Sequence, residues 1–237
     1  MVYALQGILR EWTFKSYCRN DYGIQTRAMR VLDLFSGLGG WSEAFRERHH
    51  EVVTVDREAK FKPTILSDVT RLESSDLGKF DIVLASPPCE CFSVMTISRY
   101  WNRQGDPGSQ AKDAIQTVKN TIKLIHEIDP RFWVLENPRA LLRTVIGKPA
   151  YTVTYCQYGA SYMKPTDLWG KIPDNFHPRR CARYAKCHVA TPRGSHNNPG
   201  SNGLGKNTEL MAKVPYGLSL AMCIAAETTI LGGKPSE

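Results

Sequence analysis

The feature that most constrains the fold is a repeated unit, in which a short apolar run is followed by a turn and then by an amphipathic segment. Residues 31–35 form the first run, three glycines follow, and residues 40–48 show a helical pattern. Further apolar runs occupy residues 51–55, 80–85 and 132–135. Strands that alternate with helices are typical of parallel sheets. We therefore expect an α/β fold with a doubly wound, mostly parallel, Rossmann-like sheet.

The rest of the chain extends this pattern and adds an irregular N-terminus. Residues 113–127 carry an apolar stripe that predicts a helix, and residues 217–231 predict a closing helix. Short strands are expected at residues 152–157 and 167–169. Aromatic side chains in residues 1–30 recur without a clear period, so we expect an N-terminal extension packed on the domain.

Composition places the chain among soluble globular proteins. Its 237 residues are 42% hydrophobic and 23% charged, which suits one core with a small appended module. No apolar run approaches about 18 residues, so neither a membrane span nor a membrane partner is expected. Seven cysteines at irregular spacing favour reduced intracellular thiols over a disulfide framework. We expect a cytoplasmic monomer.

A strongly basic segment lies near the carboxyl end of the chain. The net charge is +8, and residues 175–206 contain no Asp or Glu. The cations of this segment are Arg179, Arg180, Arg183, Lys186, Arg193 and Lys206. Such a patch suits a nucleic-acid phosphate backbone, but a solvated basic loop without a partner has the same composition. Composition leaves both interpretations open.

The third apolar run leads directly to a candidate nucleophile. Pro87 and Pro88 stop the strand and fix the backbone that presents Cys89 at the strand's carboxyl end. Ligands of open α/β sheets bind outside those ends. A free cysteine is more often a small buried hydrophobe, but that alternative leaves the two prolines unexplained. Cys91 is a weaker candidate, because in an extended segment it would point away from the face used by Cys89.

The first glycine-rich turn predicts a ligand pocket. Gly37, Gly39 and Gly40 follow the first strand and would let a ligand approach the backbone closely. Asp56 ends the next strand, where an acid commonly binds ribose hydroxyls. The glycine spacing is not the dinucleotide fingerprint. These residues alone leave NAD, FAD, S-adenosylmethionine and a plain tight turn as alternatives.

Three segments, taken in order, resemble the motifs of cytosine-5 DNA methyltransferases. Residues 33–40 resemble the family's Asp-Leu-Phe-x-Gly-x-Gly-Gly motif, and residues 88–93 resemble Pro-Cys-Gln-x-Phe-Ser, with Glu90 at the usual Gln position. Residues 136–138 resemble its Glu-Asn-Val/Pro motif. The resemblance implies methylation of carbon 5 of cytosine in double-stranded DNA. It also suggests a compact, divergent branch, of the kind found in phages or mobile elements, acting in a bacterial, archaeal or phage-infected host cell.

The resemblance gives the catalytic residues their roles. Cys89 would add to carbon 6 of a flipped-out cytosine, which makes carbon 5 nucleophilic. Glu136 would pair with ring nitrogen 3 and the exocyclic amine, for which a raised pKa would help. A structural acid that caps the following helix is the alternative for Glu136. Ser93 matches the motif serine and would contact DNA phosphate or shape the loop.

The resemblance also selects S-adenosylmethionine as the cofactor. It implies that Phe35 packs on the adenine, that Asp56 holds the ribose, and that Asp68 accepts from the adenine amino group. Either acid could instead be a strand-end cap. The complete predicted cofactor set is Phe35, Gly37, Gly39, Gly40, Asp56, Asp68, Val69 and Pro88.

The predicted DNA-binding surface has two parts. Residues 96–112 form a long polar stretch that would act as a lid over the flipped base. Residues 175–206 occupy the place of the family's target-recognition region, which leaves residues 1–174 and 207–237 as the catalytic domain. The predicted DNA contacts are Arg99, Arg103, Gln157, Lys164, Arg179, Arg180 and Arg183.

The chain departs from the family pattern in two places. Both arginines of the usual Gln-x-Arg-x-Arg motif are absent after Gln157, and Lys164 or Arg139 would have to supply the charge. The late Gly-Asn-Ser motif appears as Gly217-Leu218-Ser219, so the Asn contact to the cofactor is lost. The missing arginines leave a catalytically silent DNA-binding or regulatory relative as an alternative. An RNA cytosine-5 methyltransferase is a further alternative, although the Cys-Phe-Thr that the RNA-acting branch usually has after its catalytic Cys region is absent here.

Two cysteines of the basic segment raise the question of zinc. Cys181 and Cys187 lie among His177, His188 and His196. Five residues separate these cysteines, whereas zinc motifs usually have two to four, so no metal site is predicted from this spacing.

Overall fold

The computed structural model describes residues 17–19, 25–94, 96–182, 187 and 208–231. Its centre is a seven-stranded sheet in the order β5-β4-β3-β6-β7-β9-β8. Within this sheet β9 runs antiparallel to both of its neighbours, and the other pairs are parallel. The strands are β3 (Arg30–Leu34), β4 (Glu51–Asp56), β5 (Ile65–Leu66), β6 (Ile82–Ala85), β7 (Phe132–Pro138), β8 (Tyr151–Thr154) and β9 (Pro165–Lys171). The predicted doubly wound, mostly parallel fold is confirmed.

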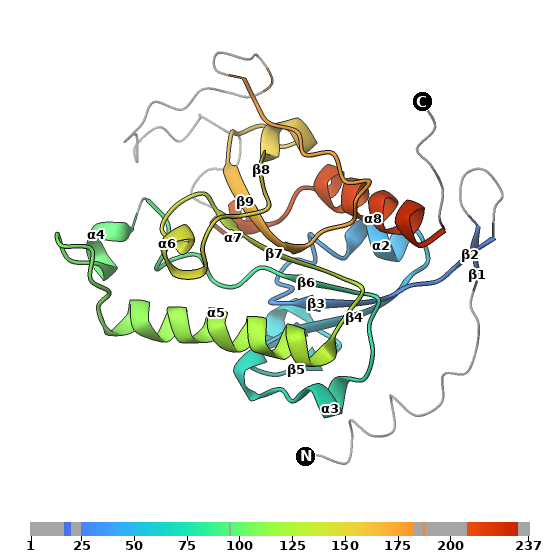
Figure 1. Ribbon diagram of the computed structural model, residues 1–237, viewed down its shortest axis with the longest axis horizontal. Coiled ribbons are helices and arrows are strands. Elements are labelled where there is room, and N and C mark those ends of the chain that lie inside the picture. Colours follow the sequence, from blue (N-terminus) through green and yellow to red (C-terminus); the bar gives the residue numbers. More distant parts are fainter. Residues whose placement is uncertain (1–16, 20–24, 95, 183–186, 188–207, 232–237) are drawn as a thin grey trace.

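Helices cover both faces of the sheet, and alternation along each strand decides which face a side chain meets. Val31 packs in the cluster that contains Phe45 of α2 (Glu43–Glu47) and Leu218 of α8 (Tyr216–Leu231). Leu32, the next residue, packs instead in the cluster that contains Ile125 of α5 (Ser109–Ile128). Figure 1 shows α5 and α8 on opposite sides of the strands. The central strands are therefore buried on both faces, which explains their continuous apolar sequences.

Short helices connect these elements. Two of them, α4 (Ile97–Tyr100) and α6 (Leu142–Ile146), follow the carboxyl ends of β6 and β7 and lie at the same end of the sheet (Figure 1). The others are η1 (Ala59–Phe61), η2 (Val69–Arg71), α3 (Ser74–Leu77), η3 (Tyr155–Tyr158) and α7 (Thr208–Ala212). In the predicted N-terminal extension, β1 (Tyr17–Arg19) and β2 (Gln25–Arg27) form a separate antiparallel pair.

Several predicted boundaries move, and contacts that sequence periodicity does not reveal explain two of the changes. The strand expected at residues 152–157 ends at Thr154, after which η3 begins. β7 continues to Pro138, three residues past the predicted end at residue 135, because β9 pairs with it as far as Pro138. α5 begins at Ser109 rather than at residue 113, and Gly108 before it donates its N–H to the Tyr100 carbonyl at 2.8 Å. The predicted lid at residues 96–112 therefore contains α4 and the first turn of α5.

One stretch is longer and more apolar than the sequence analysis allowed for. By length and composition alone, Glu209–Ile230 could cross a membrane. Pro215 separates this stretch into α7 and α8, and α8 packs Leu218, Met222 and Ala226 into the core cluster on one face of the sheet. Burial in the core accounts for the apolar character of α8.

Candidate active site and cofactor cavity

The loop after β6 holds Cys89 by backbone contacts on both of its sides. Pro87 is buried, and its carbonyl accepts a hydrogen bond from Asn137 Nδ2 of β7 at 3.0 Å. The Cys89 carbonyl accepts from the N–H groups of Phe92 and Ser93, each at 3.0 Å. Phe92 is fully buried and anchors the turn in the core. The loop thus fixes the backbone around a half-buried thiol, and Ser93 contributes to its shape.

Glu136 lies inside β7 rather than beyond its end. It pairs with Leu168 of β9, and the residue is only 3% exposed. The Tyr155 hydroxyl donates to Glu136 Oε1 at 2.8 Å. A buried carboxylate needs such partners, because burial without them is costly. The structure therefore gives Glu136 a fixed position, and the sequence analysis did not anticipate the part that Tyr155 plays in it.

Lys164 is the cation of this cluster. Its Nζ lies 4.0 Å from Glu136 Oε1 and 4.5 Å from the centre of the Tyr155 ring. The Nζ also donates to the Met211 carbonyl at 3.3 Å, and the charge acts on the Cys89 thiol. Of the two cations that could replace the missing arginines, Lys164 is therefore the one beside the predicted nucleophile.

Burial controls the protonation of the cluster. It raises the pKa of the Cys89 thiol, an effect that the Lys164 charge opposes and the Glu136 carboxylate increases. Burial and the adjacent Glu136 carboxylate together raise the pKa of Tyr155 well above its ordinary value. Tyr155 therefore stays a hydrogen-bond donor at neutral pH, and Cys89 is held as a thiol until something lowers its pKa.

The glycine-rich turn after β3 borders a cavity of about 200 Å³. The backbone adopts positive φ at Phe35 (59°) and at Gly37 (47°) and Gly39 (71°). Gly40 is required for a different reason, because a Cβ there would lie 2.5 Å from the backbone oxygen of Val214. The cavity lining is Asp33, Phe35, Ser36, Gly37, Leu38, Gly40, Trp41, Phe61, Ser86, Glu209, Ala212, Lys213 and Val214.

Two predicted cofactor acids already have backbone partners. Asp56 accepts from the Gly37 N–H at 2.8 Å and from the Glu58 N–H at 2.9 Å. Asp68 accepts from the Thr70 N–H at 2.9 Å and from the Thr70 hydroxyl at 2.7 Å, so it caps η2. Neither acid lines the cavity, and the same is true of the buried Val69 and the exposed Pro88. Their roles toward a cofactor stay predictions.

Asp33 is the acid that does line the cavity. It is 1% exposed, and its Oδ2 has no hydrogen-bond partner within the described part of the chain. Burial raises its pKa to about 7, the nearby Asp56 adds to this, and Ser42 and Arg46 oppose it. Asp33 begins the Asp-Leu-Phe-x-Gly-x-Gly-Gly motif, but no role was predicted for it. An acid in the middle of an apolar strand was the available signal.

Comparison with known proteins gives the family. The family model for C-5 cytosine-specific DNA methylase matches residues 29–151, which is more than half of the chain. The chain belongs to the C-5 cytosine-specific DNA methylase family. The prediction made from the three motifs is therefore confirmed.

Individual relatives agree with this assignment. The chain is 33% identical over 172 residues to a Frog virus 3 protein named "Probable DNA (cytosine-5)-methyltransferase", matching 67% of this chain and 78% of the relative. It is 29% identical to the type II methyltransferase M1.HphI of Haemophilus parahaemolyticus, over 60% of this chain and 42% of that protein. It is 27% identical to the mouse tRNA (cytosine(38)-C(5))-methyltransferase, over 59% of this chain and 36% of that protein. The chain thus spans less than half the length of the latter two.

The cavity fits the cofactor that C-5 cytosine methylases generally use, S-adenosylmethionine. Glycines at the turn let a ligand approach the backbone, and the Phe35 ring is available for an adenine. The unpartnered Asp33 oxygen suits the positive charge of the cofactor's amino or sulfonium group. In place of the family's late Asn, Leu218 packs in the core, while Ser219 accepts from the Ala44 N–H at 3.3 Å and donates to the Trp41 carbonyl. This part of the late motif therefore supports the cavity wall.

The methylase carries a basic cleft of about 410 Å³ beside β8. Predicted contact Arg180 lines it, and so does Arg139, which the sequence analysis considered only as a replacement cation. Arg143 was not predicted, and it is held there by ion pairing with the fully buried Asp167. The complete lining is Arg139, Arg143, Lys148, Pro149, Ala150, Tyr151, Thr152, Pro178 and Arg180.

The other predicted DNA contacts are dispersed. Arg99 stacks over the Tyr100 ring at 5.6 Å in the predicted lid, and the exposed Arg103 follows α4. Arg179 lies over the Tyr158 ring at 4.5 Å. Gln157 donates through Nε2 to the Cys187 sulfur at 3.1 Å. Arg183 lies outside the described residues.

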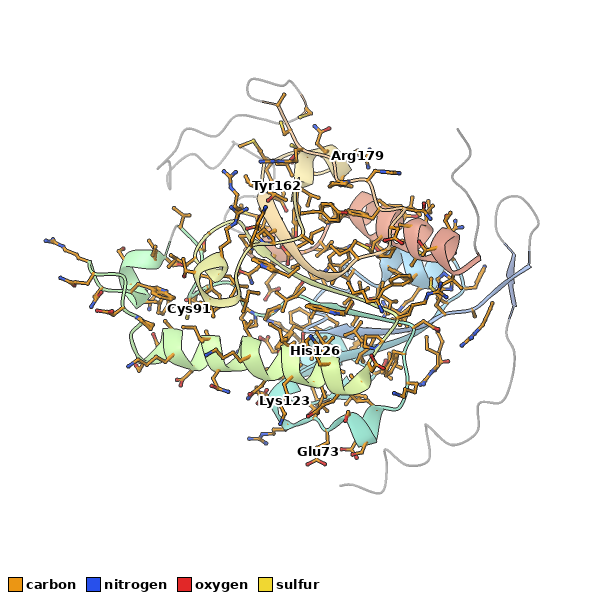
Figure 2. The ribbon with its side chains drawn as sticks, in the orientation of Figure 1. Glu73, Cys91, Lys123, His126, Tyr162 and Arg179 are labelled. Carbon is orange, nitrogen blue, oxygen red and sulfur yellow. The ribbon has the colours of Figure 1, made fainter. Side chains whose placement is uncertain are left out.

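Cys91 occupies a different environment from Cys89. Its sulfur donates to the Gln110 carbonyl at 3.6 Å, at the start of α5. Figure 2 shows Cys91 beside this end of α5, well separated from Tyr162, which lies close to β9. Burial is the first cause of the raised pKa of Cys91, and neighbouring acids add to it. Among the described residues, no cation acts on Cys91 as Lys164 acts on Cys89.

Proposed function

We propose that this chain transfers a methyl group from S-adenosylmethionine to carbon 5 of cytosine in double-stranded DNA, with Cys89 as the nucleophile. The observation that carries the proposal is the convergence of Cys89, Glu136 and Lys164 from three segments of the chain. The cofactor cavity is adjacent, because its lining includes Ser86 in the same loop as Cys89. An acid, a cation and a thiol in this arrangement suit addition to an electron-poor ring.

The chain's own residues account for the substrate chemistry. The Cys89 thiolate adds to carbon 6 of cytosine, and the electron pair of the 5,6 double bond becomes available at carbon 5. Glu136 holds the ring through nitrogen 3 and the exocyclic amine, and Tyr155 fixes the orientation of Glu136. The cofactor supplies the methyl group. Solvent then takes the carbon-5 proton, the electron pair of that C–H bond restores the 5,6 double bond, and the bond from carbon 6 to sulfur breaks to release the Cys89 thiolate.

Lys164 acts on the first step. Its charge stabilises the thiolate that the buried site otherwise disfavours. It is also close enough to the Glu136 carboxylate to balance its charge before substrate arrives. We infer that Lys164 takes over part of the task of the two arginines that the chain lacks.

The duplex would be contacted around this centre. The basic cleft at Arg139 and Arg180 would bind phosphates, and the segment at residues 96–112 would close over an extruded base. The basic segment at residues 175–206 would read the target sequence. We infer that the protein acts as a monomer in the cytoplasm of a bacterial, archaeal or phage-infected cell.

Trapping on a modified substrate tests this function directly. Duplex DNA that contains 5-fluorocytosine cannot lose a carbon-5 proton, so a covalent adduct should accumulate and survive denaturing electrophoresis. Peptide mass analysis should place the adduct on Cys89. Cys91→Ser is the matched control and should still form it, whereas Cys89→Ser should not. Methyl transfer by Cys89→Ser at the wild-type rate would reject the proposal, and so would an adduct on another residue.

RNA is a second candidate substrate, because one of the relatives is named for methylation of tRNA. The same methyl-transfer assay with tRNA and duplex DNA side by side distinguishes the two. We expect DNA to be preferred by at least an order of magnitude. A preference for tRNA would show that RNA is the substrate, and the role proposed for Cys89 would stay the same.

A catalytically silent relative is the third alternative, motivated by the missing arginines. Lys164 beside Cys89 is the observation that argues against it. The trapped adduct would exclude this alternative. Cofactor and DNA binding without any adduct would favour it.

A further inference from the structure

Three thiols from separate stretches of the chain meet at one point outside the active site. Cys156 belongs to η3, whereas Cys181 and Cys187 belong to the basic segment. Their sulfur atoms all lie within 4.8 Å of one another, and those of Cys181 and Cys187 are 3.4 Å apart. Spacing along the chain indicates only Cys181 and Cys187 as a pair, because Cys156 lies far from them in the sequence.

Hydrogen bonds that involve backbone groups hold residues 179–181 against residues 154–158. The Cys181 N–H donates to Thr154 Oγ1 at 2.5 Å, and the Thr154 N–H donates to the Arg179 carbonyl at 3.2 Å. The Arg179 N–H donates to the Tyr158 hydroxyl at 2.8 Å. The start of the basic segment is thus fixed along β8 and η3, on the side of the molecule where Figure 2 labels Arg179. The thiols are brought together by an ordered framework.

The spacing of the sulfur atoms suits a bound cation better than a disulfide. A disulfide requires about 2.05 Å between the sulfurs, which is far shorter than the 3.4 Å observed. A tetrahedral zinc with Zn–S bonds of about 2.3 Å places its sulfur ligands about 3.8 Å apart. That separation lies between 3.4 Å and the 4.8 Å limit within which all three sulfurs fall.

A neighbouring polar side chain forms a hydrogen bond to one of the candidate ligand atoms. Gln157 Nε2 donates to the Cys187 sulfur at 3.1 Å. Hydrogen bonds to ligand atoms orient them and favour the charged form that binds metal. The same Gln157 is the residue that matches the family's DNA-contact motif, so the thiol cluster and that part of the predicted DNA surface are adjoining.

We propose that Cys156, Cys181 and Cys187 bind a zinc ion, which fastens the beginning of the basic segment to the catalytic domain. Three soft thiolates in a reducing compartment select zinc over hard cations. A fourth ligand is needed for a tetrahedron, and within the described ranges no further His, Cys, Asp or Glu joins the cluster. A solvent molecule would complete the tetrahedron.

A second group of side chains with potential ligand atoms is not expected to bind a metal ion. His50, Cys223 and Glu227 also lie close together. Glu227, however, already accepts from Arg48 Nη2 at 2.8 Å and lies 2.9 Å from His50 Nε2. The other ring nitrogen of His50, Nδ1, accepts from the Met29 N–H at 3.2 Å, so the potential ligand atoms of His50 are already engaged. One zinc per chain is therefore expected.

The first test measures the metal content of the full-length protein. The chain is purified with a tag that contains no histidine, under reducing conditions and without a chelator, and is analysed by elemental mass spectrometry. We expect about one zinc per chain. The double variant Cys181→Ser/Cys187→Ser should retain less than about a tenth of it, whereas the matched cysteine variant Cys91→Ser should retain all of it. Zinc-free wild type, or equal zinc in the double variant, would overturn the proposal.

A second measurement needs no variant and so does not depend on whether a variant folds. Native wild-type protein is treated with iodoacetamide, before and after a chelator, and each cysteine is followed by peptide mass spectrometry. The exposed Cys187 should be protected and become at least tenfold more reactive when zinc is removed, while Cys91 should not change. Fast alkylation of Cys187 without a chelator, or a Cys181–Cys187 disulfide, would reject the zinc site. Neither measurement depends on methyl transfer, so the metal site and the proposed function can fail separately.

Discussion

The cofactor cavity and the catalytic cluster are neighbouring sites that are built in opposite ways. Seven of the thirteen residues that line the cavity come from the single stretch 33–41, and Asp56 accepts a hydrogen bond from the backbone of that stretch. The cluster takes Cys89, Glu136, Tyr155 and Lys164 from separate segments, and its contacts run between side chains. The cavity thus depends on local backbone geometry, whereas the cluster depends on the sheet that brings its parts together.

This difference predicts that the two sites respond separately to substitution. Changes in the cluster should alter the chemical step and its pH dependence while cofactor binding persists. Changes in the cavity should alter cofactor affinity first. The following substitutions test that separation, from the largest expected effect on activity to the smallest.

Removal of the nucleophile should have the largest effect. Cys89→Ala should lower methyl transfer to DNA by about 10⁴-fold or more, because no other group in the cluster can form the adduct. Calorimetry should show cofactor affinity within about threefold of wild type, since the cavity is intact. Cys91→Ala is the control and should keep most of the activity. A large loss of cofactor binding in Cys89→Ala would mean that the two sites are not separable.

Removal of the cluster's cation, Lys164, should have the second-largest effect on activity. Lys164→Gln raises the pKa of Cys89 further, because the charge that opposes the burial effect is lost. We expect about a 10²-fold loss of kcat at pH 7.5, with partial recovery as the pH rises. Lys164→Arg keeps the charge and should recover most of the rate. An unchanged pH profile in Lys164→Gln would show that the lysine has no influence on the thiol.

Asp33→Asn tests the cavity. The pKa of Asp33 is about 7 in the folded protein, whereas an unperturbed Asp, as in the unfolded chain, has a pKa of 3.8. The folded state therefore binds the proton of Asp33 more tightly. Its contribution to stability is present below pH 3.8 and is lost as the pH rises through 7. At pH 8 the variant should be the more stable protein, by at most about 4 kcal/mol.

The same variant should bind S-adenosylmethionine about tenfold more weakly, because a charged hydrogen-bond acceptor is lost. Denaturant unfolding from pH 5.5 to 8.5 and calorimetric titration of the cofactor measure the two effects. If the difference in stability between the two proteins stayed constant across this pH range, it would contradict the raised pKa of Asp33.

The smallest effect is expected at Tyr155. Tyr155→Phe removes the donor to Glu136 Oε1, which leaves a buried acceptor without that partner. We expect a loss of about 1–3 kcal/mol in the free energy of unfolding and a several-fold lower kcat. Cofactor affinity should not change. Tyr162→Phe is a matched control, because Tyr162 donates to the Met211 carbonyl and not to Glu136.

The predictions from sequence succeeded where the information was local. The family, the parallel sheet and the positions of its main strands followed from short motifs and apolar periodicity, and they are confirmed. Cys89 and Glu136 were predicted from the same motifs. Their roles stay predictions, although the structure places each within electrostatic reach of the other.

The parts that sequence reasoning missed depend on pairing over long distances. Tyr155 was part of an expected strand, and nothing nearby in the sequence linked it to Glu136. The antiparallel insertion of β9 between β7 and β8 creates that contact. Cys156 was missed in the same way, because a rule for spacing along the chain cannot detect a ligand contributed by another segment.

The tight contact between Gly40 and Val214 has a consequence for the order in which the protein is made. Val214, Lys213 and Ala212 form part of the cavity wall, yet they are synthesised long after the glycine turn. A ribosome-bound chain that has not yet released these residues lacks that part of the wall. The cavity wall can therefore be completed only after residues 212–214 have left the ribosome.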